Sequence, residues 1–334
     1  MMRSLFSAVS GLRNNQTAMD VIGNNISNVN TTGFKASRTL FQDIFSQTLV
    51  QASAPTDTIG GRNPQQVGLG MNIAGIALSM TEGSTQSTSN PLDFAISGEG
   101  FFVVDMNGVL GKLHENEDGD LVQVPYTNDS FVFTRAGALA LDADGYLVTQ
   151  NGHRVVGVLD QVIEDEDTGE VRSVIQNPLE GDVTFSHLKI SGEILEPVLD
   201  EFGDQVIDID GNPVFEKHTL SNYKIDEKGF ITAMTETGET RTIGRLLLAT
   251  FPNSAGVEKI GMSYYRQSQN TGAVNMDFAG EGRGVLKSGA LEMSNVDLAN
   301  ELTNMIITQR SYQANSRVIT TSDTLLEELI NLKR

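Results

Sequence analysis

Apolar and small side chains recur every three or four positions near the start of the chain. This spacing places them on one face of a helix, which we predict over Ser4–Val29. The face carries no charge, and Asn and Thr residues with Gly33 follow it, which are residues that end helices. The apolar residues of this helix that we expect to contact a partner helix are Leu5, Val9, Leu12, Met19, Ile22 and Ile26.

The end of the chain shows the same spacing over a longer stretch. We predict one helix over Asn295–Lys333, with Ser294 or Asn295 as its N-cap and Asp297 in its first turn. Further apolar residues lie beside the main stripe, and one partner helix cannot cover so wide a face. The candidate contact residues are Leu298, Leu302, Met305, Ile306, Tyr312, Ile319, Leu325 and Leu329.

The sequence between the two helices predicts β-structure. Short apolar runs such as Phe101–Val104 and Leu139–Leu141 alternate with turn pairs such as Asp144-Gly145 and Asn151-Gly152, which are hairpin signals. Before this region we expect a connecting segment over 35–70, with one more helical stretch around Leu40–Leu49.

The predicted fold class is α+β, with the N- and C-terminal helices pairing as a coiled coil and a mainly-β middle of one or two domains. Residues 1–34 and 288–334 would form the coiled-coil domain. Residues 71–159 and 221–287 would form the β core, and residues 160–220 an acidic inserted β domain or lobe.

Charge separates the middle of the chain from its ends. The 334 residues carry a net charge of −20, and residues 105–240 alone hold 28 acidic and 8 basic residues. Nucleic acid and anionic membrane surfaces would repel such a chain, so we expect neither as a partner. The nearly neutral ends can pack against copies of themselves, whereas the acidic middle stays solvated.

Candidate catalytic or binding chemistry is weak throughout. The four His share no metal-ligand spacing, and the absence of Cys excludes disulfides and thiol chemistry. The GxGxG run at Gly280–Gly284 lacks a helix directly after it, and Asp142 and Asp144 lack the rest of a calcium loop. We therefore expect no enzyme activity, no cofactor and no metal. We also expect no membrane insertion and no cleaved signal peptide.

Two classes of function remain open on these patterns. The two helices could pair inside one monomer that acts as a β-domain binding module. Alternatively, they could pair between many copies and form a polymer, which the wide apolar face of the second helix favours.

Four segments, among them Gly244–Phe251, are similar to one known family. Residues 7–35, SAVSGLRNNQTAMDVIGNNISNVNTTGFK, resemble the N-terminal signature of the bacterial flagellar rod, hook and hook-associated axial proteins. Residues 288–334 resemble the other end of that family, and Leu92–Ile96 with the following glycines resembles its first core strand. The motif positions that carry the N-terminal match are Asn24, Asn25, Asn28, Gly33 and Phe34.

The resemblance implies a structural subunit that is exported without a cleaved signal and polymerises into a hollow helical tube. It implies as partners other copies of the chain, the rod, the hook cap, the hook–filament junction proteins and the flagellar export apparatus. Within the family, residues 63–70 and the ending Leu329–Arg334 look most like the hook members, whose tube lies outside the cell on the basal body. The start, Met1–Leu5, is similar to the distal rod members.

Overall fold

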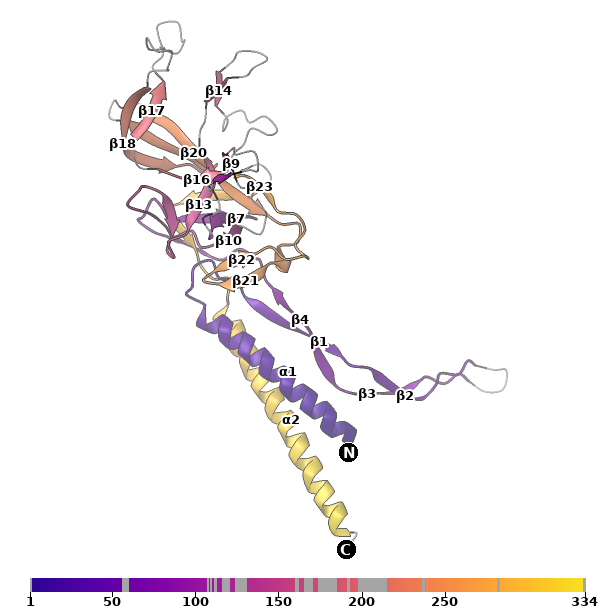
Figure 1. Ribbon diagram of the computed structural model, residues 1–334. Coiled ribbons are helices and arrows are strands. Elements are labelled where there is room, and N and C mark those ends of the chain that lie inside the picture. Colours follow the sequence, from indigo (N-terminus) through magenta and orange to yellow (C-terminus); the bar gives the residue numbers. More distant parts are fainter. Residues whose placement is uncertain are drawn as a thin grey trace. The chain divides into compact units, whose positions relative to one another are not determined.

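The chain contains two long helices that flank a β-rich middle, as seen in a computed structural model (Figure 1). The structure describes residues 2–55, 60–106, 108, 110, 113–115, 121–123, 131–159, 162–164, 171–173, 185–190, 193–197, 215–235, 238, 240–280 and 283–332. Helix α1 spans Met2–Ser27 and helix α2 spans Leu298–Leu332. Neither of these helices is long and apolar enough to cross a membrane.

The chain divides into two compact units. The helical unit comprises Met1–Asn30, Lys35–Thr81 and Ser294–Arg334, and the β unit comprises Thr31–Phe34 and Glu82–Met293. These boundaries differ from the predicted ones, because the connecting segment and the first strands after it belong with the helices.

Four strands of the helical unit form a two-stranded ribbon. Strand β1 (Ser37–Asp43) pairs antiparallel with β4 (Met71–Leu78), and β2 (Ser46–Val50) pairs antiparallel with β3 (Gln65–Gly68). Figure 1 shows the second pair continuing from the first. The helix predicted around Leu40–Leu49 is therefore wrong. Pairing with distant residues 65–78 decides the conformation here, and local spacing does not reveal that pairing.

Most strands of the β unit join one antiparallel sheet. Its main path runs β17-β18-β19-β20-β13-β7-β10-β22-β21, with β11, β12, β16 and β23 attached to it. The strands are β7 (Phe101–Asp105), β10 (Phe131–Thr134), β11 (Leu139–Leu141), β12 (Leu147–Thr149), β13 (Arg154–Leu159), β16 (Ser186–His187), β17 (Glu193–Pro197), β18 (Phe215–Ile225), β19 (Phe230–Thr235), β20 (Thr240–Thr250), β21 (Glu258–Gly261), β22 (Tyr264–Arg266) and β23 (Asn275–Phe278).

Smaller strand pairs complete the β unit. They are β5 (Thr85–Ser87) with β25 (Ala290–Glu292), β6 (Phe94–Ser97) with β24 (Val285–Ser288), β8 (Leu113–Glu115) with β9 (Leu121–Gln123), and β14 (Val162–Glu164) with β15 (Val171–Ser173). A short 3₁₀ helix spans Ser254–Gly256. Much of the predicted insertion at 160–220 lies outside the described residues. Of its described strands, β14 and β15 form a separate pair, whereas β16 and β17 belong to the main sheet.

A large hydrophobic cluster lies in the core of the β unit. Residues far apart in the sequence, such as Phe94, Phe102, Leu147 and Leu246, have no exposed surface in it. The predicted hairpin turns at Asp144-Gly145 and Asn151-Gly152 are confirmed, since each connects two paired strands that contribute to this core. Burial of these aliphatic and aromatic side chains supplies the main stabilisation of the β unit.

Candidate assembly surface

Helices α1 and α2 lie against each other and run in opposite directions. Gly11 of α1 faces Asn315 of α2, and near the other end of α1 the Asn25 side chain donates a hydrogen bond to Glu301 Oε1 at 3.3 Å. Figure 1 shows the two helices side by side, in indigo and yellow. The predicted terminal helices are thus present, and they pair within one chain.

Both helices contribute a seam with the three-and-four spacing of a coiled coil. The buried positions of α1 hold small or polar residues as well as Ile22, and they are Ala8, Gly11, Asn15, Ala18, Ile22 and Asn25. In α2 the same spacing joins positions that are buried or half-buried, namely Glu301, Met305, Thr308, Tyr312, Asn315, Ile319, Ser322 and Leu326. This spacing supports the predicted coiled coil.

Gly11 lies directly against the Asn315 side chain of α2. A Cβ atom at Gly11 would lie 2.6 Å from Nδ2 of Asn315, whereas a Cβ at Gly23 of the same helix would meet nothing within 4 Å. Small residues let the backbones approach, which explains why the seam passes through Ala8 and Ala18 and not through the bulky stripe.

The predicted contact residues fall into two groups. In α1, Ile22 is buried and Leu5, Val9, Leu12, Met19 and Ile26 are half-buried, because the seam lies one position away from the stripe that they form. In α2, Met305, Tyr312 and Ile319 lie on the seam, whereas Leu298, Leu302, Ile306, Leu325 and Leu329 are between 43% and 58% exposed. The second group leaves an apolar surface on α2, and its contact with another copy stays a prediction.

Asn25 belongs to the N-terminal motif and joins three elements of the helical unit. Its Nδ2 donates to the carbonyl of Ser37 at 2.8 Å, and its Oδ1 accepts from the Ser37 N–H at 3.0 Å. The same Nδ2 reaches Glu301 of α2. The sequence indicated the motif, but the hydrogen bonds of this buried amide become visible only in the fold.

A second asparagine supports the base of the ribbon. Oδ1 of Asn295 accepts from the Ala36 N–H at 2.8 Å, and its Nδ2 donates to the carbonyls of Ser79 at 2.9 Å and Thr81 at 3.1 Å. Asn295 was predicted as an N-cap of the last helix. Instead Asp297 caps α2, since its Oδ1 accepts from the Ala299 N–H at 2.9 Å.

Glu301 is the half-buried carboxyl at the Asn25 end of the seam. Desolvation by burial raises its pKa, and the neighbouring Asp297 raises it further, whereas the hydrogen bond from Asn25 lowers it. The helical unit therefore contains a carboxyl group that prefers its protonated form more than a solvated glutamate does.

The remaining motif residues have different environments. Asn28 donates from Nδ2 to the carbonyl of Asn24 at 2.9 Å, one turn earlier in the chain. Gly33 lies in the β unit with φ +67°, and its N–H donates to the Glu292 carbonyl at 2.8 Å. The ring of Phe34 lies 4.5 Å from the ammonium of Lys259, and burial lowers the pKa of that lysine.

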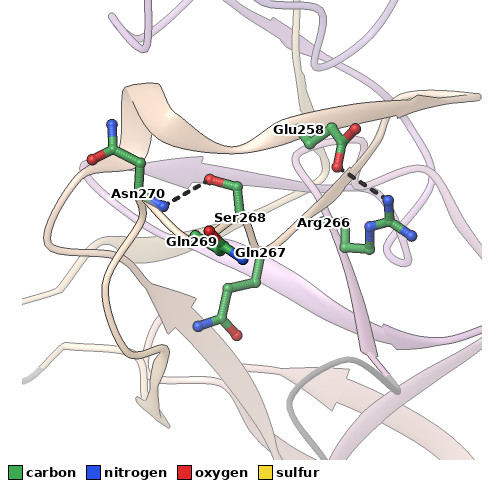
Figure 2. A pocket seen from close by; sticks show the side chains of 6 residues that line it. All are labelled: Glu258, Arg266, Gln267, Ser268, Gln269 and Asn270. Carbon is green, nitrogen blue, oxygen red and sulfur yellow. Dashed lines mark hydrogen bonds and ion pairs between the residues drawn. The ribbon is translucent and has the colours of Figure 1, made fainter.

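The β unit also contains an open hollow of about 710 Å³, which is lined by six polar or charged residues (Figure 2). Glu258 and Arg266 form an ion pair at 3.0 Å, but their side chains are 59% and 49% exposed. Ser268 Oγ accepts the N–H of Asn270 at 3.2 Å. Among the residues that the structure describes, no group of three or more His, Asp and Glu could hold a metal ion.

Comparison with known proteins connects these elements to one family. Residues 5–35, which cover most of α1, match the family described as "Flagella basal body rod protein". Residues 287–332, which cover α2, match "Flagellar basal body rod FlgEFG protein C-terminal", and residues 118–233 match "Flagellar hook protein FlgE/F/G D1 domain". A curated relative, the flagellar basal-body rod protein FlgG of Bacillus subtilis, is 37% identical over the whole of both chains.

The chain belongs to the flagellar rod and hook protein family.

Members of the flagellar rod and hook protein family are structural proteins and not enzymes, and they polymerise into the axial structure of the flagellum. The flagellar hook protein FlgE of Borreliella burgdorferi is 32% identical over the whole of both chains, and the rod protein FlgG of the same organism is 31% identical. The predicted family and the absence of an enzyme function are therefore confirmed. Rod and hook relatives match this chain at similar identity.

Proposed function

We propose that this chain is the subunit of the flagellar hook, which polymerises into a hollow, curved helical tube. The observation that carries polymerisation is the apolar surface of α2, where Leu302 and Ile306 are 49% and 58% exposed even after α1 has packed on the helix. A monomeric binding module would have no use for this surface, whereas a second copy would bury it. Residues 63–70 and the ending Leu329–Arg334 support the hook within the family.

In this proposal the tube passes torque from the rod to the filament. Its neighbours would be the rod, the hook cap and the junction proteins, and the flagellar export apparatus would deliver it outside the cell without cleavage of a signal. The nearly neutral helices would line the tube. The strongly acidic β unit would stay solvated, so contacts between its copies would be weak and readily exchanged as the tube bends.

The distal rod is the second candidate, and alignment length favours it. The alignment with the Bacillus subtilis rod protein spans 337 positions, close to the 334 residues of this chain. The alignment with the Borreliella burgdorferi hook protein spans 462 positions, 128 more than this chain has residues. That hook relative therefore contains long segments without a counterpart here.

Deletion of the gene, followed by electron microscopy of isolated basal bodies, distinguishes the two candidates. Loss of a hook subunit leaves a complete rod that carries no hook, whereas loss of a distal rod subunit leaves a shortened rod.

Assembly of the purified chain at high salt is a second test, since curved tubes support the hook and straight tubes support the rod. Salt screens the repulsion between acidic units and strengthens apolar burial. A chain that stays monomeric and whose deletion leaves the flagellum intact would contradict both candidates.

A further inference from the structure

We propose that Asn151 is a latent deamidation site, which the tip of the β12–β13 hairpin and the hydroxyl of Tyr264 hold in its unreacted amide form. The inference does not depend on the proposed function, because it concerns the chemistry of one hairpin within the β unit. Asn151 lies between strands β12 and β13 and is followed by Gly152, and both residues are exposed.

An Asn-Gly pair is the sequence in which an asparagine side chain reacts most readily with its own backbone. The backbone nitrogen of Gly152 would attack Cγ of Asn151 and form a C–N bond that closes a succinimide ring. The side-chain nitrogen then leaves as ammonia and takes the proton of the attacking nitrogen. Water opens the ring at either carbonyl, which gives aspartate or isoaspartate. Glycine favours the attack because it has no Cβ to block the approach of its nitrogen.

The hairpin tip has room for the ring, and the reaction would damage the sheet. A Cβ at Gly152 would meet nothing within 4 Å, so no neighbouring atom excludes a succinimide there. Isoaspartate adds a carbon atom to the main chain and so disturbs the register of β13 against β12. Strand β13 contributes the buried side chains of Val155, Val156 and Val158, which depend on that register.

The backbone of the hairpin keeps the two reacting atoms apart. The Gly152 N–H donates to the carbonyl of Thr149 at 2.9 Å, and the Thr149 N–H donates to the carbonyl of His153 at 2.8 Å. Gly152 has φ +82°, so the loop has the pattern of a type I turn followed by a left-handed residue. At the Asn151 position of such a turn ψ is about 0°, which directs the following nitrogen away from the asparagine side chain.

The side chain of Asn151 is held as well. Its Nδ2 donates to the hydroxyl of Tyr264 at 3.2 Å, and the same hydroxyl lies 2.7 Å from Oγ1 of Thr149. Tyr264 is buried in strand β22, and its ring lies edge-on to the ring of His153 with centroids 5.6 Å apart. The nitrogen that must leave is thus bonded to a fixed group, so this bond and the turn both have to open before the ring forms.

Peptide mapping of the full chain measures the reaction, since mass spectrometry detects aspartate and isoaspartate at position 151. The folded chain and the chain unfolded in urea are incubated at the same mildly alkaline pH. Because the folded hairpin has to open first, we expect deamidation at Asn151 to be at least about tenfold slower in the folded chain. Equal rates in the folded and unfolded chains would overturn the proposal.

A matched pair of substitutions tests the role of Tyr264 as a positioning residue. Tyr264→Phe removes the hydroxyl that holds the Asn151 amide, whereas Thr149→Val removes the other hydroxyl of the network and leaves that bond in place. We expect Tyr264→Phe to raise the rate at Asn151 about threefold or more and Thr149→Val to leave it nearly unchanged.

Urea denaturation of the same two variants separates this role from a general loss of stability. Faster deamidation in Tyr264→Phe at a stability equal to that of Thr149→Val would support the proposal. An unchanged rate in Tyr264→Phe, or equal acceleration in both variants, would overturn the assignment of Tyr264.

Discussion

Arg135 and Glu292 form a buried ion pair in which Nη1 donates to Oε2 at 3.0 Å, with side chains that are 4% and 0% exposed. Other atoms of the pair also find partners, although the buried Nε of Arg135 has none among the described residues. Arg135 Nη2 donates to the Gly98 carbonyl at 2.6 Å, and Glu292 Oε1 accepts the Gly83 N–H at 3.1 Å. The pair thus joins the segments at which the chain enters and leaves the β unit.

Removal of one partner of this pair should destabilise the β unit strongly. Glu292→Ala leaves the guanidinium buried without its counter-charge, so we expect the free energy of unfolding to fall by about 3–5 kcal/mol. Urea denaturation followed by circular dichroism measures the change. The double variant Arg135→Met with Glu292→Leu removes both charges and should recover most of the loss. A single variant as stable as the unsubstituted chain would contradict this account.

Two glycines of α1 give a matched test of the helix seam. Gly11→Ala and Gly23→Ala gain the same helix propensity of about 1 kcal/mol. The new methyl group meets Asn315 at Gly11 but nothing within 4 Å at Gly23. We therefore expect Gly23→Ala to raise the thermal midpoint of the helical signal and Gly11→Ala to raise it less or lower it. Equal effects at both positions would show that α1 and α2 do not approach closely in solution.

Gly33 should be far less tolerant of substitution than another glycine with positive φ. A Cβ at Gly33 would lie 2.7 Å from backbone atoms of Arg135 and Ala136, whereas Gly152, with φ +82°, has nothing within 4 Å. We expect Gly152→Ala to cost about 1–2 kcal/mol from backbone strain alone. Gly33→Ala adds a backbone displacement and should cost clearly more. Urea denaturation of both variants is the measurement, and a smaller loss at Gly33 would be inconsistent with the packing.

Glu301 should make the helical unit sensitive to pH. Its pKa is raised above the ordinary 4.5 by burial and by Asp297, so the folded state binds the proton more tightly than the unfolded state. Stability from this group is fully present below the ordinary pKa and is lost as pH rises through the raised value.

Thermal unfolding across the weakly acidic range measures that dependence. In the Glu301→Gln variant the amide oxygen can still accept the hydrogen bond from Asn25, but the side chain no longer titrates. The unfolding midpoint of this variant should therefore change less with pH. Asp323→Asn, on an exposed position of the same helix, is the control. The pH dependence of its unfolding midpoint should be close to that of the unsubstituted chain. Identical pH profiles for Glu301→Gln and the unsubstituted chain would rule out this role.

The exposed apolar face of α2 should be needed for assembly but not for folding. Ile306→Asp places a charge on that face, whereas Asn304→Asp places the same charge on an exposed position on another side of the helix. We expect Ile306→Asp to abolish tubes at salt concentrations at which Asn304→Asp still forms them. Circular dichroism should show the β unit intact in both variants. Normal tubes from Ile306→Asp would remove the apolar face of α2 as an assembly surface.

Local patterns in the sequence were sufficient to predict the two helices, several hairpins and the family. Helix periodicity depends on neighbours three and four residues away, and turn pairs such as Asp144-Gly145 act through their own backbone preferences. The asparagines, Gly33 and Phe34 of the N-terminal motif were recognisable for the same reason, since they are adjacent in the chain. Charge is likewise a property of composition, and it separated the acidic middle from the nearly neutral ends.

Tertiary structure alone decided which surfaces meet. The bulky stripe of α1 was the stronger sequence signal, yet the seam passes through Ala8, Gly11 and Ala18 because small residues allow the helices to approach. Residues 40–49 became strands because they pair with residues 65–78, a long-range contact that local spacing cannot encode. Arg135 and Glu292 are separated by 157 positions, and only the folded chain places these two charges beside each other, where burial makes each dependent on the other.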